Sequence, residues 1–140
     1  MKILFDTNVL LDALLARDPF VADAVFLLEA VKSKKIGGFL SATTTDIHYL
    51  VRKQTKSSEK AIAAVAKLLK LLNVCLVDRN ILEQAIALAG TDFEDNVQLA
   101  CAISLELDAI VTRDDSGFSG SSVSIMSPTV LREWLLQQEE

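Results

Sequence analysis

The chain has 140 residues, a length at which one compact domain with its own hydrophobic core is the usual arrangement. Hydrophobic residues make up 51% and charged residues 24%, with 5 Gly and 2 Pro, which excludes a disordered, collagen-like or low-complexity chain. The net charge of −5 argues weakly against nucleic acid, and no apolar run approaches the roughly 18 residues of a membrane span. We therefore predict one globular domain over residues 1–140 with no membrane association.

Short apolar runs alternate with helical patterns along the chain. Asp18-Pro19 is a typical helix start, with Asp18 as N-cap, and Asp78 is the expected cap of a later helix. In chain order we predict a strand at 2–5, helices at 8–15 and from 18 to about 33, a strand at 37–42, helices at 43–53 and 58–72, a strand at 73–77, helices at 79–89 and 94–107, strands at 109–112 and 123–126, and a C-terminal helix opened by Ser127-Pro128.

The predicted strands are short, apolar throughout rather than alternating, and separated by helices. This pattern is typical of a parallel sheet that is covered on both faces. The fold class is therefore α/β: a three-layer α/β/α sandwich with a short-stranded parallel sheet of four to five strands. In such open sheets, ligands bind beyond the carboxyl ends of the strands.

The two cysteines, Cys75 and Cys101, lie inside apolar runs and are too few for a disulfide framework or a CxxC metal site. We expect two buried free thiols in a reducing compartment. The N-terminal segment MKILFDTN places Asp6 where a secretory leader would continue its apolar region. A cytoplasmic location is therefore expected.

Aspartates stand at several predicted strand ends. Asp6 follows the first strand directly, and Asp114 follows the fourth; Asp95 begins the helix that leads into that strand, and Asp46 lies early in the helix after the second. Two unit charges about 5 Å apart at an effective dielectric near 20 repel by roughly 3 kcal/mol. Carboxylates gathered there would either take up protons or bind a hard cation such as Mg²⁺ or Mn²⁺. His48 is the only histidine, so a His-rich zinc site is excluded.

Each acid also has a structural interpretation. Asp18 and Asp78 are expected only to cap helices, and Asp95 could simply complement the dipole of its helix. Asp6 fits this explanation less well because it ends an apolar strand. The shared location of the acids is therefore what favours chemistry.

The charges are unevenly distributed. Residues 32–70 hold nine basic and two acidic residues, whereas the rest of the chain holds five basic and seventeen acidic ones. A polyanion would feel the basic part locally despite the negative total, although solvated helix faces would give the same distribution.

Four segments together resemble the PIN domain family over nearly the whole chain: FDTNVLLDALLARDPF, LSATTTDIHYLVRK, TDFEDNVQLACAI and AIVTRDDSGFSGS. The resemblance implies an α/β/α fold whose clustered acids bind Mg²⁺ or Mn²⁺ and cleave RNA. It also implies a homodimer and, as in many small bacterial members of the VapC type, a toxin paired with an antitoxin protein.

The resemblance assigns roles residue by residue. Asp6, Asp95 and Asp114 correspond to metal-holding acids, and Asp46, where most members have Glu, completes the catalytic set. The auxiliary residues are Asn8, Asp92, Thr112 and Asp115. We expect Arg52, Lys53 and Lys56, on the helix after Asp46, to contact RNA phosphates.

Two alternatives remain open. Asp46 in place of Glu, and Gly117 in place of the usual Asp, would suit a weak or inactive PIN-like module that binds RNA or protein. A phosphotransfer enzyme or receiver is the other alternative, since Asp6 and Asn8 approach the Asp-x-Asp nucleophile motif and Asp78 ends a strand as a phosphoacceptor would.

Overall fold

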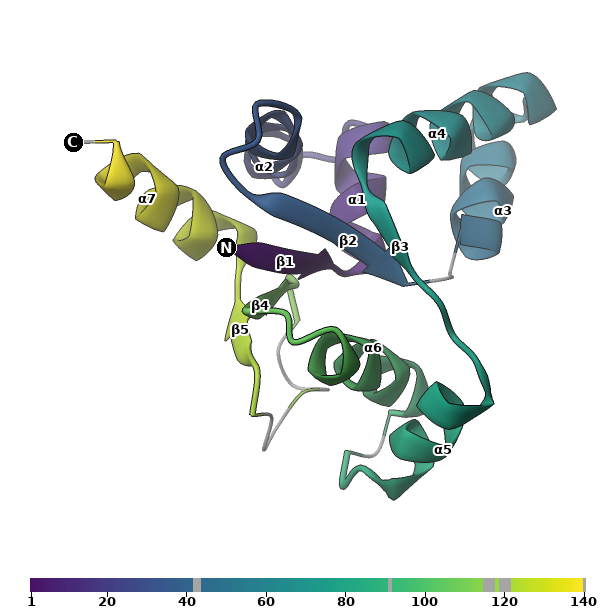
Figure 1. Ribbon diagram of the computed structural model, residues 1–140. Helices are drawn as coiled ribbons and strands as arrows, with labels where there is room; N and C mark the ends of the chain where they lie inside the picture. The colour runs from purple at the N-terminus through teal and green to yellow at the C-terminus, as the bar shows by residue number, and fades with distance from the viewer. Residues whose placement is uncertain (42–43, 91, 115–117, 119–121, 140) are drawn as a thin grey trace.

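One parallel sheet of five strands organises the molecule, with helices on both of its faces (Figure 1). The structure, a computed structural model, describes residues 1–41, 44–90, 92–114, 118 and 122–139, with the backbone alone for Thr44 and Thr45. The predicted three-layer α/β/α sandwich is confirmed. The elements are β1 (Lys2–Phe5), α1 (Thr7–Leu14), α2 (Val21–Lys32), β2 (Gly37–Ser41), α3 (Thr44–Thr55), α4 (Ser58–Leu71), β3 (Asn73–Cys75), α5 (Arg79–Ala87), α6 (Phe93–Ser104), β4 (Ala109–Val111), β5 (Ser124–Met126) and α7 (Pro128–Gln138).

The strand order is β3-β2-β1-β4-β5, so β1 is central. Its side chains alternate between two hydrophobic clusters. Ile3 and Phe5 pack with α1, α2, α3, α4 and α7, whereas Leu4 packs with α5 and α6 on the opposite face. Because both faces of the sheet are covered, every buried position of β1 is apolar, and only Lys2 at its exposed start is charged.

The predicted cap at Asp18 is wrong. Helix α2 begins at Val21, and the Asp18-Pro19 peptide, which is cis, lies in the preceding turn. The amides of Phe20 and Val21 both donate to the carbonyl oxygen of Arg17, at 2.9 and 2.8 Å, so that carbonyl supplies the bonds that open the helix. Asp78, by contrast, does cap its helix: its Oδ1 accepts a hydrogen bond from the Ile81 amide at 3.0 Å.

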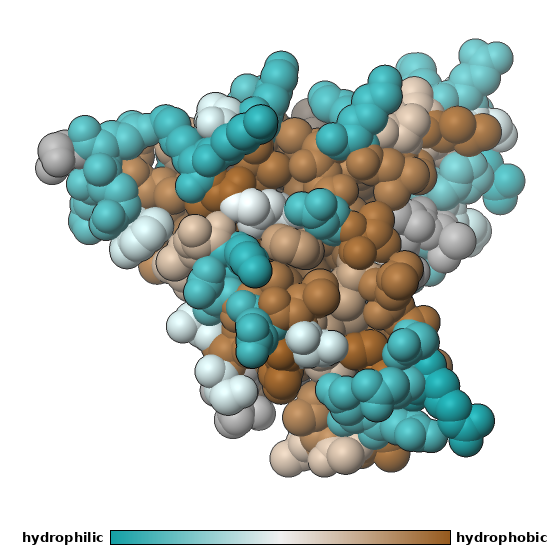
Figure 2. Space-filling model, in the orientation of Figure 1, coloured by the Kyte–Doolittle hydropathy of each residue, from teal (hydrophilic) through white to brown (hydrophobic). Residues whose placement is uncertain are grey.

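Several strands are shorter than predicted. The strands expected at 73–77 and 109–112 end at Cys75 and Val111. β3 lies at the edge of the sheet, and Leu76 just beyond it is 79% exposed. Figure 2 shows hydrophobic side chains across the middle of the face on which β2 and β3 lie, with hydrophilic ones mostly around its outline. The edge strand therefore leads into apolar surface.

Both cysteines are free and buried, as expected. They belong to the cluster under α5 and α6. Burial first, and then the neighbouring Cys75, raises the pKa of the Cys101 thiol far above its usual value, so the thiol stays protonated. Within the part of the chain that the structure describes, no helix is long and apolar enough to cross a membrane.

Gly38 of β2 lies in close contact with side chains of the overlying helical layer. A Cβ built there would lie 2.5 Å from Leu72 Cδ2 and 2.9 Å from Val31 Cγ2, whereas one at Gly37 would meet its nearest neighbour at 3.7 Å. We predict that Gly38→Ala lowers the free energy of unfolding by about 1–3 kcal/mol through overpacking. Urea unfolding measures the change, with Gly37→Ala as the matched control; equal stabilities of the two variants would contradict the close packing.

Candidate functional site

Asp6 lies where the central strand β1 ends. Its amide donates to the Val111 carbonyl at 3.0 Å, which continues the pairing with β4. Asp6 is the N-cap residue of α1, but its carboxylate makes no capping hydrogen bond. Instead Oδ1 accepts from Gln98 Nε2 at 3.1 Å and Oδ2 accepts from Thr112 Oγ1 at 2.7 Å. The side chain is therefore directed toward the carboxyl edge of the sheet rather than into a cap.

Thr112 links Asp6 to Asp114. Its side chain is buried, and its Oγ1 lies 3.1 Å from the Asp114 carbonyl oxygen and accepts from the Asp114 amide at 3.2 Å. The Thr112 hydroxyl has one hydrogen to donate. The Asp6 carboxylate is both closer than the Asp114 carbonyl and charged, so it accepts that hydrogen. Thr112 therefore holds the first residues after β4 beside Asp6.

Asp95 completes the group of three. It lies in the first turn of α6, whose N-cap Asp92 accepts a hydrogen bond from the Asp95 amide at 3.1 Å. Burial, followed by the charges of Asp92, Asp6, Asp114 and Glu94, raises the pKa of Asp95 to about 6. These carboxylates therefore interact electrostatically, as the sequence predicted for Asp6, Asp95 and Asp114.

A cleft of about 610 Å³ lies between these acids and helices α1 and α3 of the other helical layer. Asp46 and Asn8 are exposed and line it from α3 and α1, and Asp92 lines it while capping α6. Asp115 and Gly117 lie outside the described residues. The full lining is Asp6, Thr7, Asn8, Leu11, Asp46, Tyr49, Leu50, Val77, Asp92, Phe93, Glu94, Asp95, Val97, Gln98 and Asp114.

Arg113, between Thr112 and Asp114, is directed to a different acid. Its Nε lies 2.7 Å from Oδ2 of Asp12, a fully buried residue of α1. The guanidinium also stacks over the Phe20 ring at 4.0 Å. Because Asp12 takes up this charge, the cation nearest in sequence to the acids does not neutralise them.

The donor set suits a hard cation. The cleft offers carboxylate oxygens, and the buried Oε1 of Gln98 has no hydrogen-bond partner among the described residues. Mg²⁺ and Mn²⁺ prefer such oxygen ligands and keep several waters. Among residues 1–41, 44–90, 92–114, 118 and 122–139, however, no three acid, His or Cys side chains converge closely enough to hold an ion by themselves. Water would have to supply part of a coordination shell here.

The basic stretch 32–70 is divided between different surfaces. Arg52, Lys53 and Lys56 are exposed at the end of α3. Lys53 is seven residues after Asp46 and therefore continues the helix face that lines the cleft. Lys34 lies near the amino ends of β1 and β2, at the opposite edge of the sheet.

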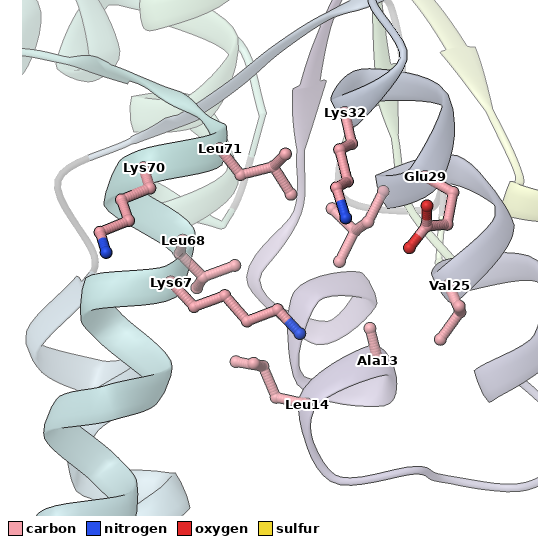
Figure 3. A pocket seen from close by; sticks show the side chains of 10 residues that line it. Ala13, Leu14, Val25, Glu29, Lys32, Lys67, Leu68, Lys70 and Leu71 are labelled. Carbon is pink, nitrogen blue, oxygen red and sulfur yellow. The ribbon is translucent and has the colours of Figure 1, made fainter.

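Other lysines border a second hollow, a groove of about 520 Å³ between α1, α2 and α4 (Figure 3). Lys32 and Lys67 extend into the space between α2 and α4 (Figure 3). Leucines from all three helices form its floor. The groove is lined by Ala13, Leu14, Val25, Leu28, Glu29, Lys32, Lys67, Leu68, Lys70 and Leu71. It shares no lining residue with the acidic cleft.

Sequence reasoning missed three cleft residues. Gln98 interrupts the apolar run VQLACAI three residues after Asp95, so helical spacing alone places both on one face. Tyr49 and Phe93 are 53% and 47% exposed within the cleft lining. Their exposure depends on tertiary packing and has no sequence signal.

The raised pKa of Asp95 makes stability depend on pH. Because the folded pKa of about 6 exceeds the ordinary value of 3.8, the folded state binds the proton more tightly, and stability falls as pH rises through that interval. With EDTA at about pH 7.5, we predict that Asp95→Asn raises the free energy of unfolding by on the order of 1 kcal/mol, allowing for solvent screening, or the melting temperature by about 3 °C. The difference should shrink as pH falls through that interval and disappear only below about pH 3.8.

Thermal unfolding followed by circular dichroism measures this, with Glu59→Gln on α4, an exposed acid outside the cleft, as the control. A melting temperature of Asp95→Asn below that of the unsubstituted protein at the higher pH would contradict repulsion among these acids.

Several solved structures share this fold. A toxin–antitoxin complex from Klebsiella pneumoniae is 22% identical, with a TM-score of 0.64, over 90% of this chain and 97% of that chain. VapC20 of Mycobacterium tuberculosis, described as a sarcin–ricin loop cleaving toxin, is 19% identical, with a TM-score of 0.67, over 85% and 95%. VapBC2 of Rickettsia felis, bound to a promoter DNA fragment, is 15% identical, with a TM-score of 0.64, over 91% and 98%. Such low identities show the fold alone.

No curated protein matches the chain in sequence. A family model does match it: the model described as the PIN domain covers residues 2–116 and so spans β1 to β4 together with the acids named above. Since the match covers most of the chain, the protein belongs to the PIN domain family.

Proposed function

We propose that this chain is an endoribonuclease that hydrolyses RNA phosphodiester bonds with Mg²⁺ or Mn²⁺, and that it acts as the toxin of a toxin–antitoxin pair. The observation that carries the proposal is that Asp6, Asp95 and Asp114 line one cleft at the carboxyl edge of the sheet, where burial and then the neighbouring acids raise the pKa of Asp95 to about 6. A bound divalent cation would offset the repulsion among these carboxylates and favour their ionised forms. PIN nucleases generally depend on such an ion.

The chemistry divides between the ion and the chain. A divalent ion, when bound, supplies an acidified water and polarises the phosphoryl oxygen. Asp6, Asp95 and Asp114 would hold it, and Gln98 and Thr112 fix the plane of the Asp6 carboxylate through the two hydrogen bonds described above. One carboxylate would accept the proton of the attacking water, and Asp46 is available for this role across the cleft.

Exposed aromatic and basic side chains beside the acids suit a single-stranded RNA. Tyr49 and Phe93 line the cleft with half of their surface open, so bases can stack on them without sequence preference. Lys53 follows on the same face of α3, with Arg52 and Lys56 nearby, and these charges would attract the phosphate backbone.

A second candidate is a PIN-like module that binds RNA or protein without cleaving. It is favoured by the finding that no three acids of the described residues converge on one point, and by the short Asp46 side chain. A receiver role is disfavoured because Asp78 caps α5 instead of standing free as a phosphoacceptor.

The groove between α1, α2 and α4 suits the antitoxin. Its apolar floor and the rim lysines Lys32, Lys67 and Lys70 complement an amphipathic helix with an acidic flank. The expected homodimer would need a separate apolar contact, and Leu76 and Ile86, at 79% and 73% exposure, offer one outside this groove.

Replacing one metal-holding acid tests the nuclease directly. We predict that Asp6→Asn lowers the rate of RNA cleavage with Mn²⁺ by more than about 100-fold, because loss of a ligand exceeds the effect typical of outer-shell substitutions. Cleavage of mixed RNA oligonucleotides, with and without EDTA, measures the effect. Asp18→Asn, an exposed acid outside the cleft, is the matched control and should keep full activity. RNA binding without cleavage by the unsubstituted protein would favour the binding module.

Substitution of Lys53 on α3 tests where the RNA lies on the protein. We predict that Lys53→Glu raises the KM for RNA by about tenfold and reduces its salt dependence, while kcat changes little, since Lys53 contacts phosphate rather than the reacting atoms. Lys34→Glu makes the same change of charge at the opposite edge of the sheet and should leave KM unaltered. Equal effects of the two variants would indicate that only the net charge matters.

A further inference from the structure

Gln98 is a polar side chain buried in an otherwise apolar stretch of α6. It is only 6% exposed and lies between Val97 and the buried Leu99. One helical turn separates it from Asp95, and both line the acidic cleft. Burying an amide costs free energy unless its polar atoms are satisfied, so its presence here requires an explanation.

The amide nitrogen of Gln98 is satisfied by Asp6. Gln98 Nε2 donates to Asp6 Oδ1 at 3.1 Å while Thr112 donates to the other carboxylate oxygen at 2.7 Å. An ionised carboxylate only accepts hydrogen bonds, so the nitrogen of the amide must face Asp6. The contact therefore also fixes the direction of the carbonyl oxygen, Oε1.

The amide carbonyl of Gln98 is not satisfied by the described part of the chain. Oε1 is buried and has no hydrogen-bond partner among the described residues. Buried polar atoms without a partner are rare and indicate a missing partner, which for a carbonyl oxygen is a donating water or a coordinated cation. Because the Gln98 side chain borders the cleft, the donor that it lacks can be supplied from there.

We propose that Gln98 is a positioning residue for the acidic centre, an inference that rests on the proposed function. Its Nε2 holds the Asp6 carboxylate in place, and its Oε1 accepts a hydrogen bond from a water of the cation's shell. The described residues give Asp6 one donor for each oxygen, so loss of Gln98 leaves Oδ1 without its protein donor. A water-holding role also fits the finding that carboxylates alone do not enclose an ion here.

Gln98→Met tests the proposal, since it keeps length and volume but removes both polar atoms. We expect the dissociation constant for Mn²⁺, measured by calorimetry or electron paramagnetic resonance without RNA, to rise about 10–100-fold, as for other residues that orient metal ligands. kcat should fall with KM for RNA unchanged. Gln137→Met, at the end of α7, is the matched control and should match the unsubstituted protein.

Gln98→Glu separates the two contacts and decides the matter where the Met variant fails to fold. At a pH high enough to ionise it beside Asp6, Glu keeps an acceptor but cannot donate to Asp6. Mn²⁺ binding should persist while kcat still falls at least about tenfold, a split that a purely structural residue would not give.

Mn²⁺ affinity and kcat of both folded variants within about twofold of the unsubstituted protein would overturn the role of Gln98 while leaving the nuclease proposal intact. An unsubstituted protein that neither binds Mn²⁺ nor cleaves RNA would overturn both.

Discussion

Electrostatic repulsion among carboxylates at one edge of the sheet is the constraint on which the rest of the site depends. Parallel pairing of β1 with β4 places their carboxyl ends together, so Asp6 and Asp114 are neighbours by topology. Helix α6 leads into β4 and therefore begins at the same edge, which brings Asp95 to them. A parallel sheet with these residues at its strand ends cannot separate the charges.

The surrounding structure offsets part of this repulsion without removing it. Asp6 and Asp95 lie at the amino ends of α1 and α6, where the helix dipole favours negative charge. Hydrogen bonds from Gln98 and Thr112 further stabilise the Asp6 carboxylate. Arg113 would neutralise the centre most directly, but its ion pair with the buried Asp12 turns its charge away. The protein thus keeps a negative site available at a cost to stability.

What the sequence predicts well follows from backbone topology. Apolar runs bounded by polar residues located all five strands. The rule that ligands bind beyond the carboxyl ends of parallel strands brought together Asp6 and Asp114, which are 108 positions apart.

The predicted cap at Asp18 was wrong because the carbonyl of Arg17 already accepts hydrogen bonds from the first amides of α2, and the local sequence does not indicate these bonds. Gln98 and Asp12 went unrecognised because their roles depend on partners 92 and 101 residues away. The uneven charge of residues 32–70 did not reveal that its basic side chains lie on different surfaces, some bordering the groove between α1, α2 and α4 and others at the end of α3.

The two walls of the cleft differ, and the difference bears on Asp46. Asp95 and the acids that raise its pKa form a group of five. Four of them lie between Asp92 and Asp95 or at the end of β1. Asp46 lies on the opposite wall, on the helix that carries Tyr49 and Lys53. Negative charge is therefore concentrated on the β1–α6 wall, whereas α3 presents an aromatic face and positive charge at its end. A cation drawn to the first wall and a phosphate chain lying along the second would meet between them. In the proposed mechanism a side chain one methylene shorter than Glu would suffice at position 46, because it would need to reach only a water beside the scissile phosphate, and not the ion.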